Sequence, residues 1–179
     1  MKNKEFFDVV IIGGGPSGSN AAVSYKKLNP ELRVGVVDKE FFPRDKSCGD
    51  AIGPGVINAL KRFDNDHILD GEPKVISTTL FGPKNIGIHN YIPKVKNKED
   101  SIVYVIPRLD LDNRIFNLAK DAGAETFEGY RYIKFIKNEE SLLVELENEN
   151  KDKLLIETKL LIGADGANSR VRKSLNLNQ

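Results

Sequence analysis

The stretch that decides the fold is DVVIIGGGPSG, residues 8–18, together with RVGVVD at 33–38. The residues VVII that follow Asp8 are apolar and β-branched, which predicts a buried strand, and a turn almost without side chains comes next. We expect a helix over 16–28, because proline is favoured in a first helical turn and Pro30 prevents continuation. The second stretch repeats the buried-strand pattern and ends on a carboxylate. Strand, glycine turn, helix, strand and acid together predict a parallel βαβ unit.

Each part of this unit has a physical role in binding a dinucleotide. Gly13 allows a tight turn, Gly15 allows a pyrophosphate to approach the main chain, and Gly18 allows the helix to pack close to the strand. The N–H groups at the start of the helix attract the phosphates, and Asp38 is placed to accept hydrogen bonds from ribose hydroxyls. Cofactor contacts are also predicted at the adjoining Pro16, Ser17 and Lys39. The alternative is a glycine-rich turn in an unrelated α/β protein.

Composition excludes several classes of function. The 27 basic and 26 acidic residues give a net charge of +1, so no nucleic-acid-binding surface is indicated. The single cysteine, Cys48, excludes an intrachain disulfide and fits a reducing compartment. No apolar run reaches the roughly 18 residues of a membrane span. His67 and His89 have no partner at metal-ligand spacing, so no metal site is expected. We expect a cytoplasmic protein and leave peripheral membrane contact open.

The rest of the chain predicts alternating elements within one domain, residues 1–179. Helices are predicted at 54–63, 110–122 and 168–175, the second with Asp110 as its cap and Gly123 just past its end. Short β-rich pieces lie between 75 and 95, on both sides of Gly82-Pro83, and a charged connection follows at 94–100. Further strands are predicted at 102–106 and 125–127. An antiparallel meander of three strands is predicted next, at 130–137, 142–147 and 154–157. A fully buried strand, KLLI at 159–162, is then expected to rejoin the parallel sheet.

A second motif, LLIGADGANSRVR, occupies residues 160–172. A buried strand leads into Gly163-Ala164-Asp165-Gly166, which places a carboxylate at the strand tip, where it can accept hydrogen bonds from the hydroxyls of a ribityl chain. The alternative is that Asp165 only caps the following helix, or that Asp165-Gly166 is an ordinary turn.

Taken together, the two motifs resemble those of FAD-dependent oxidoreductases of the aromatic-hydroxylase type. The resemblance implies an α/β fold: a Rossmann-like FAD/NAD(P)-binding βαβ fold with an inserted antiparallel β-meander. It also implies FAD as cofactor. The first motif would hold the ADP half of FAD, and the second would hold the ribityl part through Gly163, Asp165 and Gly166.

The loop FPRDKSCGDAIGPG, residues 42–55, narrows the resemblance to the geranylgeranyl reductase branch. Those enzymes use reduced FAD to saturate double bonds in isoprenoid chains. The resemblance implies that this loop lines the flavin ring through Arg44, Lys46, Cys48 and Gly49. The two cations would stabilise negative charge on reduced flavin, and Cys48 would pack beside the alkene or donate a proton. The alternatives are a solvated loop for the cations and a small buried hydrophobe for the cysteine.

Arg108 begins the string RLDLD, residues 108–112, which resembles an R-x-x-[FL]-[DN] pattern of related flavoproteins. The resemblance places Arg108 near the FAD pyrophosphate or ribityl chain. The alternative is a surface arginine.

These features predict an FAD-dependent oxidoreductase that reduces double bonds of a geranylgeranyl or other polyprenyl substrate, with NADPH or a ferredoxin as electron donor. The alternatives are an aromatic-ring monooxygenase and a non-catalytic nucleotide-binding module. Members of the superfamily continue past the second motif into a Gly-Asp strand and a substrate-binding sheet, and neither pattern occurs here. We therefore expect an N-terminal portion that alone binds FAD weakly or not at all and is inactive. The expected partner is a small isoprenoid substrate, with no nucleic acid.

Overall fold

The computed structural model describes residues 5–91 and 102–176. The chain divides into two compact units. Unit 1 comprises residues 1–44 and 112–179, and unit 2 comprises residues 45–111. The assignment of residues 1–179 to one domain stays a prediction.

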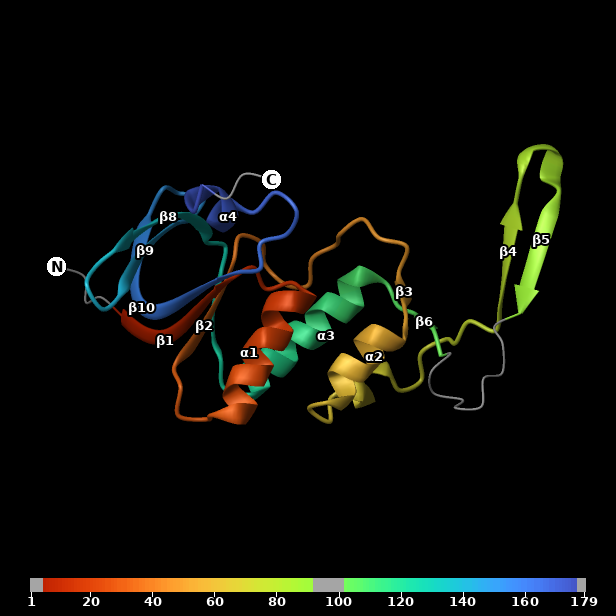
Figure 1. The fold of residues 1–179 in the computed structure, drawn as a ribbon, viewed down its shortest axis with the longest axis horizontal. Helices are drawn as coiled ribbons and strands as arrows, with labels where there is room; N and C mark the ends of the chain where they lie inside the picture. The colour runs from red at the N-terminus through yellow and green to blue at the C-terminus, as the bar shows by residue number, and fades with distance from the viewer. Residues whose placement is uncertain (1–4, 92–101, 177–179) are drawn as a thin grey trace. The chain divides into compact units, whose positions relative to one another are not determined.

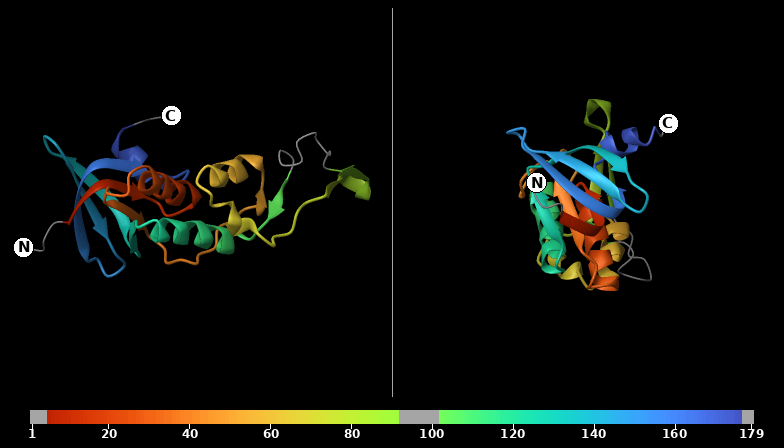
Figure 2. Two further views of the ribbon diagram at one scale, coloured as in Figure 1. Left: turned by 90° about the horizontal axis from the view of Figure 1, so that it is seen from below. Right: turned by 90° about the vertical axis from the view of Figure 1, so that its left-hand side faces the viewer.

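Unit 1 is built on one mixed sheet (Figure 1). Its strand order is β7-β2-β1-β10-β9-β8, and the strands are β1 (Glu5–Ile12), β2 (Val34–Asp38), β7 (Glu125–Glu128), β8 (Arg131–Lys137), β9 (Leu142–Glu147) and β10 (Lys153–Gly163). The first four strands in this order are parallel, and β9 and β8 continue the sheet in antiparallel fashion beyond β10 (Figure 2). The predicted Rossmann-like α/β fold with an antiparallel meander is confirmed.

Strand β1 lies at the centre of the sheet and is covered on both faces. Residues 9–12 are each at most 4% exposed, and all of β2 is buried, as expected of parallel strands. On one face, Ile11 lies against α1 (Pro16–Leu28) at Gly18. On the other face, the core joins the parallel strands, the antiparallel strands and Val171 of α4 (Arg170–Ser174); its buried members include Val10, Ile12, Val37, Tyr132, Val144, Leu146 and Ile156.

The third meander strand and the predicted strand at 159–162 are one element, so the prediction of two strands is wrong. β10 pairs antiparallel with β9 over 153–158 and parallel with β1 over 156–163. The polar residue Thr158 interrupts the run of apolar residues but does not end the strand. Its side chain is fully buried, and its hydroxyl donates to the carbonyl of Leu160. The predicted full burial is also wrong: Lys159 and Leu160 are exposed, since the pairing with β9 stops at Thr158.

The helices agree with the prediction except at their ends. α3 runs from Arg108 to Asp121, so Asp110 lies inside its first turn and not before it as a cap. Gly123 has a φ of +92° just past the end, as predicted. α4 is shorter than the predicted 168–175, and α2 (Pro54–Lys61) ends before the predicted Phe63.

In the described residues of unit 2, 45–91 and 102–111, the elements that lie wholly within the unit are short. They are β3 (Ala51–Ile52), α2, η1 (Asp66–Leu69), β4 (Ser77–Phe81), η2 (Pro83–Asn85), β5 (Gly87–Tyr91) and β6 (Tyr104–Val105), and the boundary with unit 1 falls within α3. β3 pairs with β6, and β4 with β5, both antiparallel. The two β-rich pieces predicted on either side of Gly82-Pro83 therefore form a hairpin, a pairing that the sequence did not predict. Only Tyr104 and Val105 of the predicted strand 102–106 are in a strand, and the charged connection 94–100 lies outside the described residues.

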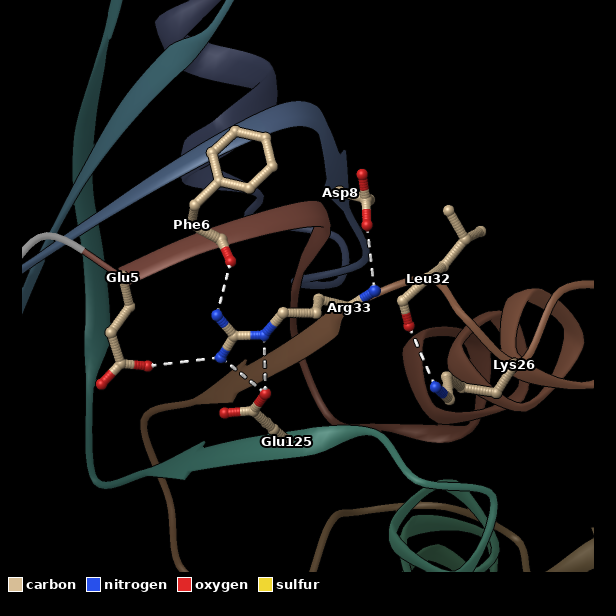
Figure 3. A network of polar contacts seen from close by, with 7 residues as sticks. All are labelled: Glu5, Phe6, Asp8, Lys26, Leu32, Arg33 and Glu125. Carbon is tan, nitrogen blue, oxygen red and sulfur yellow. Dashed lines mark hydrogen bonds and ion pairs between the residues drawn. The ribbon is translucent and has the colours of Figure 1, made fainter.

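A polar network joins the strands of unit 1 at the end away from the glycine turn (Figure 3). The Arg33 guanidinium donates to Oε1 of Glu125 on β7, through Nη2 at 2.7 Å and Nε at 3.1 Å, and to the Phe6 carbonyl on β1 at 2.9 Å. The backbone N–H of Arg33 donates to Asp8 at 3.0 Å. One residue just before β2 thus holds three parallel strands in register. Over the described part of the chain, no helix is long and apolar enough to cross a membrane.

Candidate nucleotide-binding site

At two positions of the glycine turn after β1, a side chain would collide with backbone atoms. Gly13 has a φ of +106°, and a Cβ there would lie 2.4 Å from the carbonyl oxygen of Ala164. A Cβ at Gly18 would lie 1.8 Å from the carbonyl oxygen of Gly13. The tight turn and the close helix packing predicted for these two glycines are therefore confirmed, and their contact with a cofactor stays a prediction.

The lack of a side chain at Gly15 leaves a space between the start of α1 and the Arg44 guanidinium, called the cradle from here on. Gly15 is the residue before the helix, no side chain caps the first turn, and that turn contains no acidic residue. A Cβ at Gly15 would lie 3.2 Å from Nη2 of Arg44, so a side chain would fill the space between the turn and this guanidinium. Pro16 and Ser17 form the first turn as predicted. Uncapped N–H groups and a positive helix end beside an arginine suit an anionic phosphate.

Asp38 ends β2 beside this turn. Its Oδ2 accepts from the Gly14 N–H at 2.7 Å, and its Oδ1 accepts from the Glu40 N–H at 3.0 Å. The carboxylate, 8% exposed, thus fixes the glycine turn, a role that the sequence did not predict. A carboxylate has about four acceptor positions, so hydroxyl groups of a ribose can still be accommodated. Lys39 is exposed and pairs with Glu40 at 3.1 Å.

The second motif lies directly beside the first. β1 and β10 pair in parallel up to Ile12 and Gly163, and the Ala164 N–H donates to the Ile12 carbonyl at 2.7 Å. The Asp165 carboxylate caps α4: it accepts from the Arg170 N–H at 2.6 Å, from the Val171 N–H at 3.3 Å and from the Ser169 hydroxyl. Gly166 has a φ of +82°. The capping role of Asp165 is therefore present, and the ribityl role of Gly163, Asp165 and Gly166 stays a prediction.

Arg44 is anchored within unit 1. Its Nη1 lies 3.1 Å from Oδ2 of Asp112 on α3, and these side chains are 14% and 0% exposed. The guanidinium lies 5.0 Å from the ring centre of Phe42, which stacks on Phe116 with ring centres 4.0 Å apart. The solvated-loop alternative is therefore wrong for Arg44. Sequence reasoning quoted Asp112 only as the last residue of the RLDLD string and gave it no role, although its place on the same face as the buried Ile115 and Phe116, three and four residues on, marks it as a buried acid.

Unit 2 brings two of the other predicted residues together. Cys48 is exposed, and its pKa is lowered from the ordinary thiol value by the backbone N–H of Asp50 and then by the Arg108 side chain. The Arg108 N–H also donates to Oδ1 of Asp50 at 3.2 Å. The buried-hydrophobe alternative for Cys48 is therefore wrong. Lys46 and Gly49 are exposed, and a Cβ at Gly49 would meet nothing within 4 Å. Across residues 5–91 and 102–176, no group of three or more His, Cys, Asp or Glu side chains could hold a metal.

Comparison with known proteins identifies the family. Residues 7–179 match the FAD binding domain family. The chain belongs to this family. FAD is the family's cofactor, which agrees with the uncapped helix, the cradle at Gly15 and the acid at Asp38.

Among curated proteins, the chain is 31% identical over 170 residues to menaquinone reductase of Mycolicibacterium smegmatis, covering 94% of this chain and 39% of the relative. It is also 31% identical over 171 residues to geranylgeranyl diphosphate reductase of Rhodobacter capsulatus, covering 94% and 40%. The chain thus spans about 40% of the length of these relatives.

Among solved structures, a geranylgeranyl bacteriochlorophyll reductase-like protein from Thermoplasma acidophilum superposes with a TM-score of 0.80 at 24% identity. The match covers 98% of this chain and 43% of that protein. This likeness establishes the fold, and a fold of this kind supports more than one reaction.

Proposed function

We propose that the chain is the FAD-binding part of a reductase that saturates carbon–carbon double bonds in a geranylgeranyl or related polyprenyl substrate. The observation that carries the FAD part of the proposal is the uncapped start of α1, with Gly15, Asp38 and Arg44 around it. The reductase part is supported by the PRDKSCG loop and by the names of the two curated relatives.

The residues of unit 1 would hold the ADP half of FAD. The main chain at Gly15 and Ser17 would bind the phosphates, and the carboxylate of Asp38 would accept hydrogen bonds from the ribose. For Arg44 this proposal departs from the flavin-ring contact that the resemblance implies: because its guanidinium lies beside Gly15, it would bind the phosphates instead. We further propose that Gly163, Asp165 and Gly166 face the ribityl chain. Bound FAD, once reduced by NADPH or a ferredoxin, supplies the hydride that protein side chains cannot.

Cys48 in unit 2 is the proposed proton donor to the substrate. Hydrogen bonds from the Asp50 N–H and from Arg108 stabilise its thiolate and so make the thiol a stronger acid. The thiol must also regain a proton after each turnover. Because Cys48 is exposed, it can take that proton from solvent. This pairing of an acid with a fixed cation is suited to delivering one proton to an alkene. Lys46 and Gly49 remain predicted neighbours of the flavin.

The test is reduction of the holoprotein without oxygen, carried out with whatever sequence follows Gln179 in its coding frame. Polyprenyl diphosphates and prenylated quinones are added, and their masses are measured. A gain of two hydrogens per reduced double bond, lowered by Cys48→Ser, is the expected result. Absence of a mass gain with every prenyl compound contradicts the reductase proposal.

The same preparation separates the alternatives. Phenol-stimulated NADPH oxidation that needs oxygen would indicate the monooxygenase, and flavin binding without either reaction would indicate a nucleotide-binding module. Peripheral membrane contact stays a prediction tied to a lipid substrate.

A further inference from the structure

The buried ion pair between Arg44 and Asp112 has a consequence for ligand selection. We propose that Asp112 is a positioning residue for diphosphate binding: it acts through Arg44, whose guanidinium it holds against the glycine turn at Gly15. This inference rests on the proposed function, because it takes the ADP part of FAD as the ligand.

The two terminal nitrogens of the Arg44 guanidinium have different neighbours, and this difference determines which of them a ligand could reach. Nη1 is 3.1 Å from the Asp112 carboxylate, whereas Nη2 is the atom that a Cβ at Gly15 would meet at 3.2 Å. A guanidinium carries five N–H donors in one rigid plane, so the ion pair to Asp112 leaves others directed elsewhere. Nη2 thus lies where a phosphate resting on the main chain of Gly15 would be.

The surroundings of the pair keep it in one arrangement. Asp112 is fully buried, and a buried carboxylate is strongly destabilising unless it is paired. The Phe42 ring lies under the guanidinium and is itself stacked on Phe116 of α3. Because the side chain is held before the ligand arrives, little rotamer freedom is lost on binding. Without Asp112, the same arginine would be free to turn away from the phosphates.

The charges beside the cradle favour a dianionic group. The first turn of α1 carries no acidic residue, and its amino end is positive. The nearby carboxylate of Asp38 is engaged by the N–H groups of Gly14 and Glu40. A charge-assisted bond from Arg44 would therefore add to the helix N–H groups, and the benefit should be specific to ligands that carry a diphosphate.

The test compares ADP with adenosine, which lacks the diphosphate, on the chain and its variants by NMR titration, a method that measures weak dissociation constants. Asp112→Asn should raise the dissociation constant for ADP about 10- to 100-fold and change the dissociation constant for adenosine by less than about twofold. The control is Asp110→Asn, an exposed acid on the same helix, which should change neither constant. A purely structural role for Asp112 would weaken both ligands equally, and that result, or an unchanged preference for ADP, would overturn the inference.

A second variant keeps the test valid if Asp112→Asn does not fold. The double substitution Arg44→Met/Asp112→Leu replaces the ion pair with apolar side chains, a change that buried pairs often tolerate. It should fold, bind adenosine and lose the preference for ADP, as should Arg44→Met/Asp112→Asn. Retained preference in a folded double variant would contradict the role of the pair. The same comparison is made on the protein prepared with whatever sequence follows Gln179 in its coding frame. If that unaltered protein binds neither FAD nor ADP, the proposed function fails and this inference fails with it; all other contrary results count against the inference alone.

Discussion

Gly18 is the residue at which the fold and the nucleotide site depend most directly on a missing side chain. An added Cβ would lie 1.8 Å from the carbonyl oxygen of Gly13, directly after the central strand β1, and a backbone atom there cannot move aside as a side-chain end can. Gly18→Ala should therefore lower the free energy of unfolding by about 3 kcal/mol, at the upper end of overpacking effects. The measurement is urea denaturation followed by circular dichroism. Asn20→Ala, two residues along the same helix, should stay within about 0.5 kcal/mol; equal midpoints for the two variants would contradict the prediction.

Cys48 allows a test of local electrostatics, because it is the single cysteine in the chain and labelling reports on it alone. The thiolate is the reactive form, and donors at Asp50 and Arg108 favour it. The rate of iodoacetamide alkylation should therefore rise to half its maximum at a lower pH in the folded chain than in urea. Arg108→Gln should move this midpoint upward, whereas Arg62→Gln, an exposed arginine elsewhere in unit 2, should leave it in place. Identical midpoints in the folded and unfolded chain would show that the thiol pKa is not lowered.

At the scale of the residue, sequence reasoning identified the groups whose roles are local. Gly13 and Gly18 follow from the geometry of a turn between neighbouring elements, and spacing alone indicates them. Asp112 does not, since its importance lies in a contact with Arg44, which comes from a distant part of the chain. The second role of Asp38, holding the Gly14 N–H, was likewise invisible because it depends on how the ends of two strands meet.

At the scale of the element, α4 depends on a cap supplied by two residues: Ser169, whose hydroxyl accepts from the Arg172 N–H, and Asp165, which accepts from the Arg170 and Val171 N–H groups. The five residues of α4 are too few to be stable alone, so the cap and the buried Val171 hold it in place. Asp165→Ala removes the acceptor of the Arg170 and Val171 N–H groups and should cost about 1–2 kcal/mol of unfolding free energy. Thermal denaturation of this variant beside Asn168→Ala, an exposed neighbour, measures the difference. If the two variants melt at the same temperature, Asp165 does not stabilise the helix.

Element prediction succeeded where one hydrophobic period ran without interruption. β1 beyond Asp8, β2 and α1 are such cases, and the first two strands of the meander, β8 and β9, are found within a residue of their predicted places. It failed at β10, because this strand pairs with β9 along its first half and with β1 along its second. The change of partner at Thr158 alters which side chains are covered. In the sequence, this change of partner looks like the end of one strand and the start of another. The pairing within the sheet shows that the strand continues.

At the scale of the whole molecule, the proposed nucleotide-binding residues and the cysteine loop belong to different units. Gly15, Asp38, Arg44 and Asp112 lie in the two stretches that make up unit 1, and Cys48 and Arg108 lie in the stretch between them. Sequence interpretation joined them through a resemblance to one branch of flavoproteins, and the match to the FAD binding domain family extends over both units. Composition and motif spacing contain no signal for the division itself, because no linker marks the boundaries at Arg44 and Asp112.

The division predicts that binding of ADP survives without unit 2. Residues 45–109 can be replaced by a flexible linker of about eight glycine and serine residues, which retains Asp110 and Leu111 ahead of the remainder of α3. All strands of the six-stranded sheet and the pair between Arg44 and Asp112 stay in the chain. The shortened chain should fold, by circular dichroism, and bind ADP within about threefold of the original, a change of under 1 kcal/mol. Gly15→Val in the shortened chain should abolish this binding, because the side chain would fill the cradle against Arg44. A shortened chain that folds and has lost ADP binding would mean that unit 2 contributes to the phosphate site, and the assignment of that site to unit 1 would be wrong.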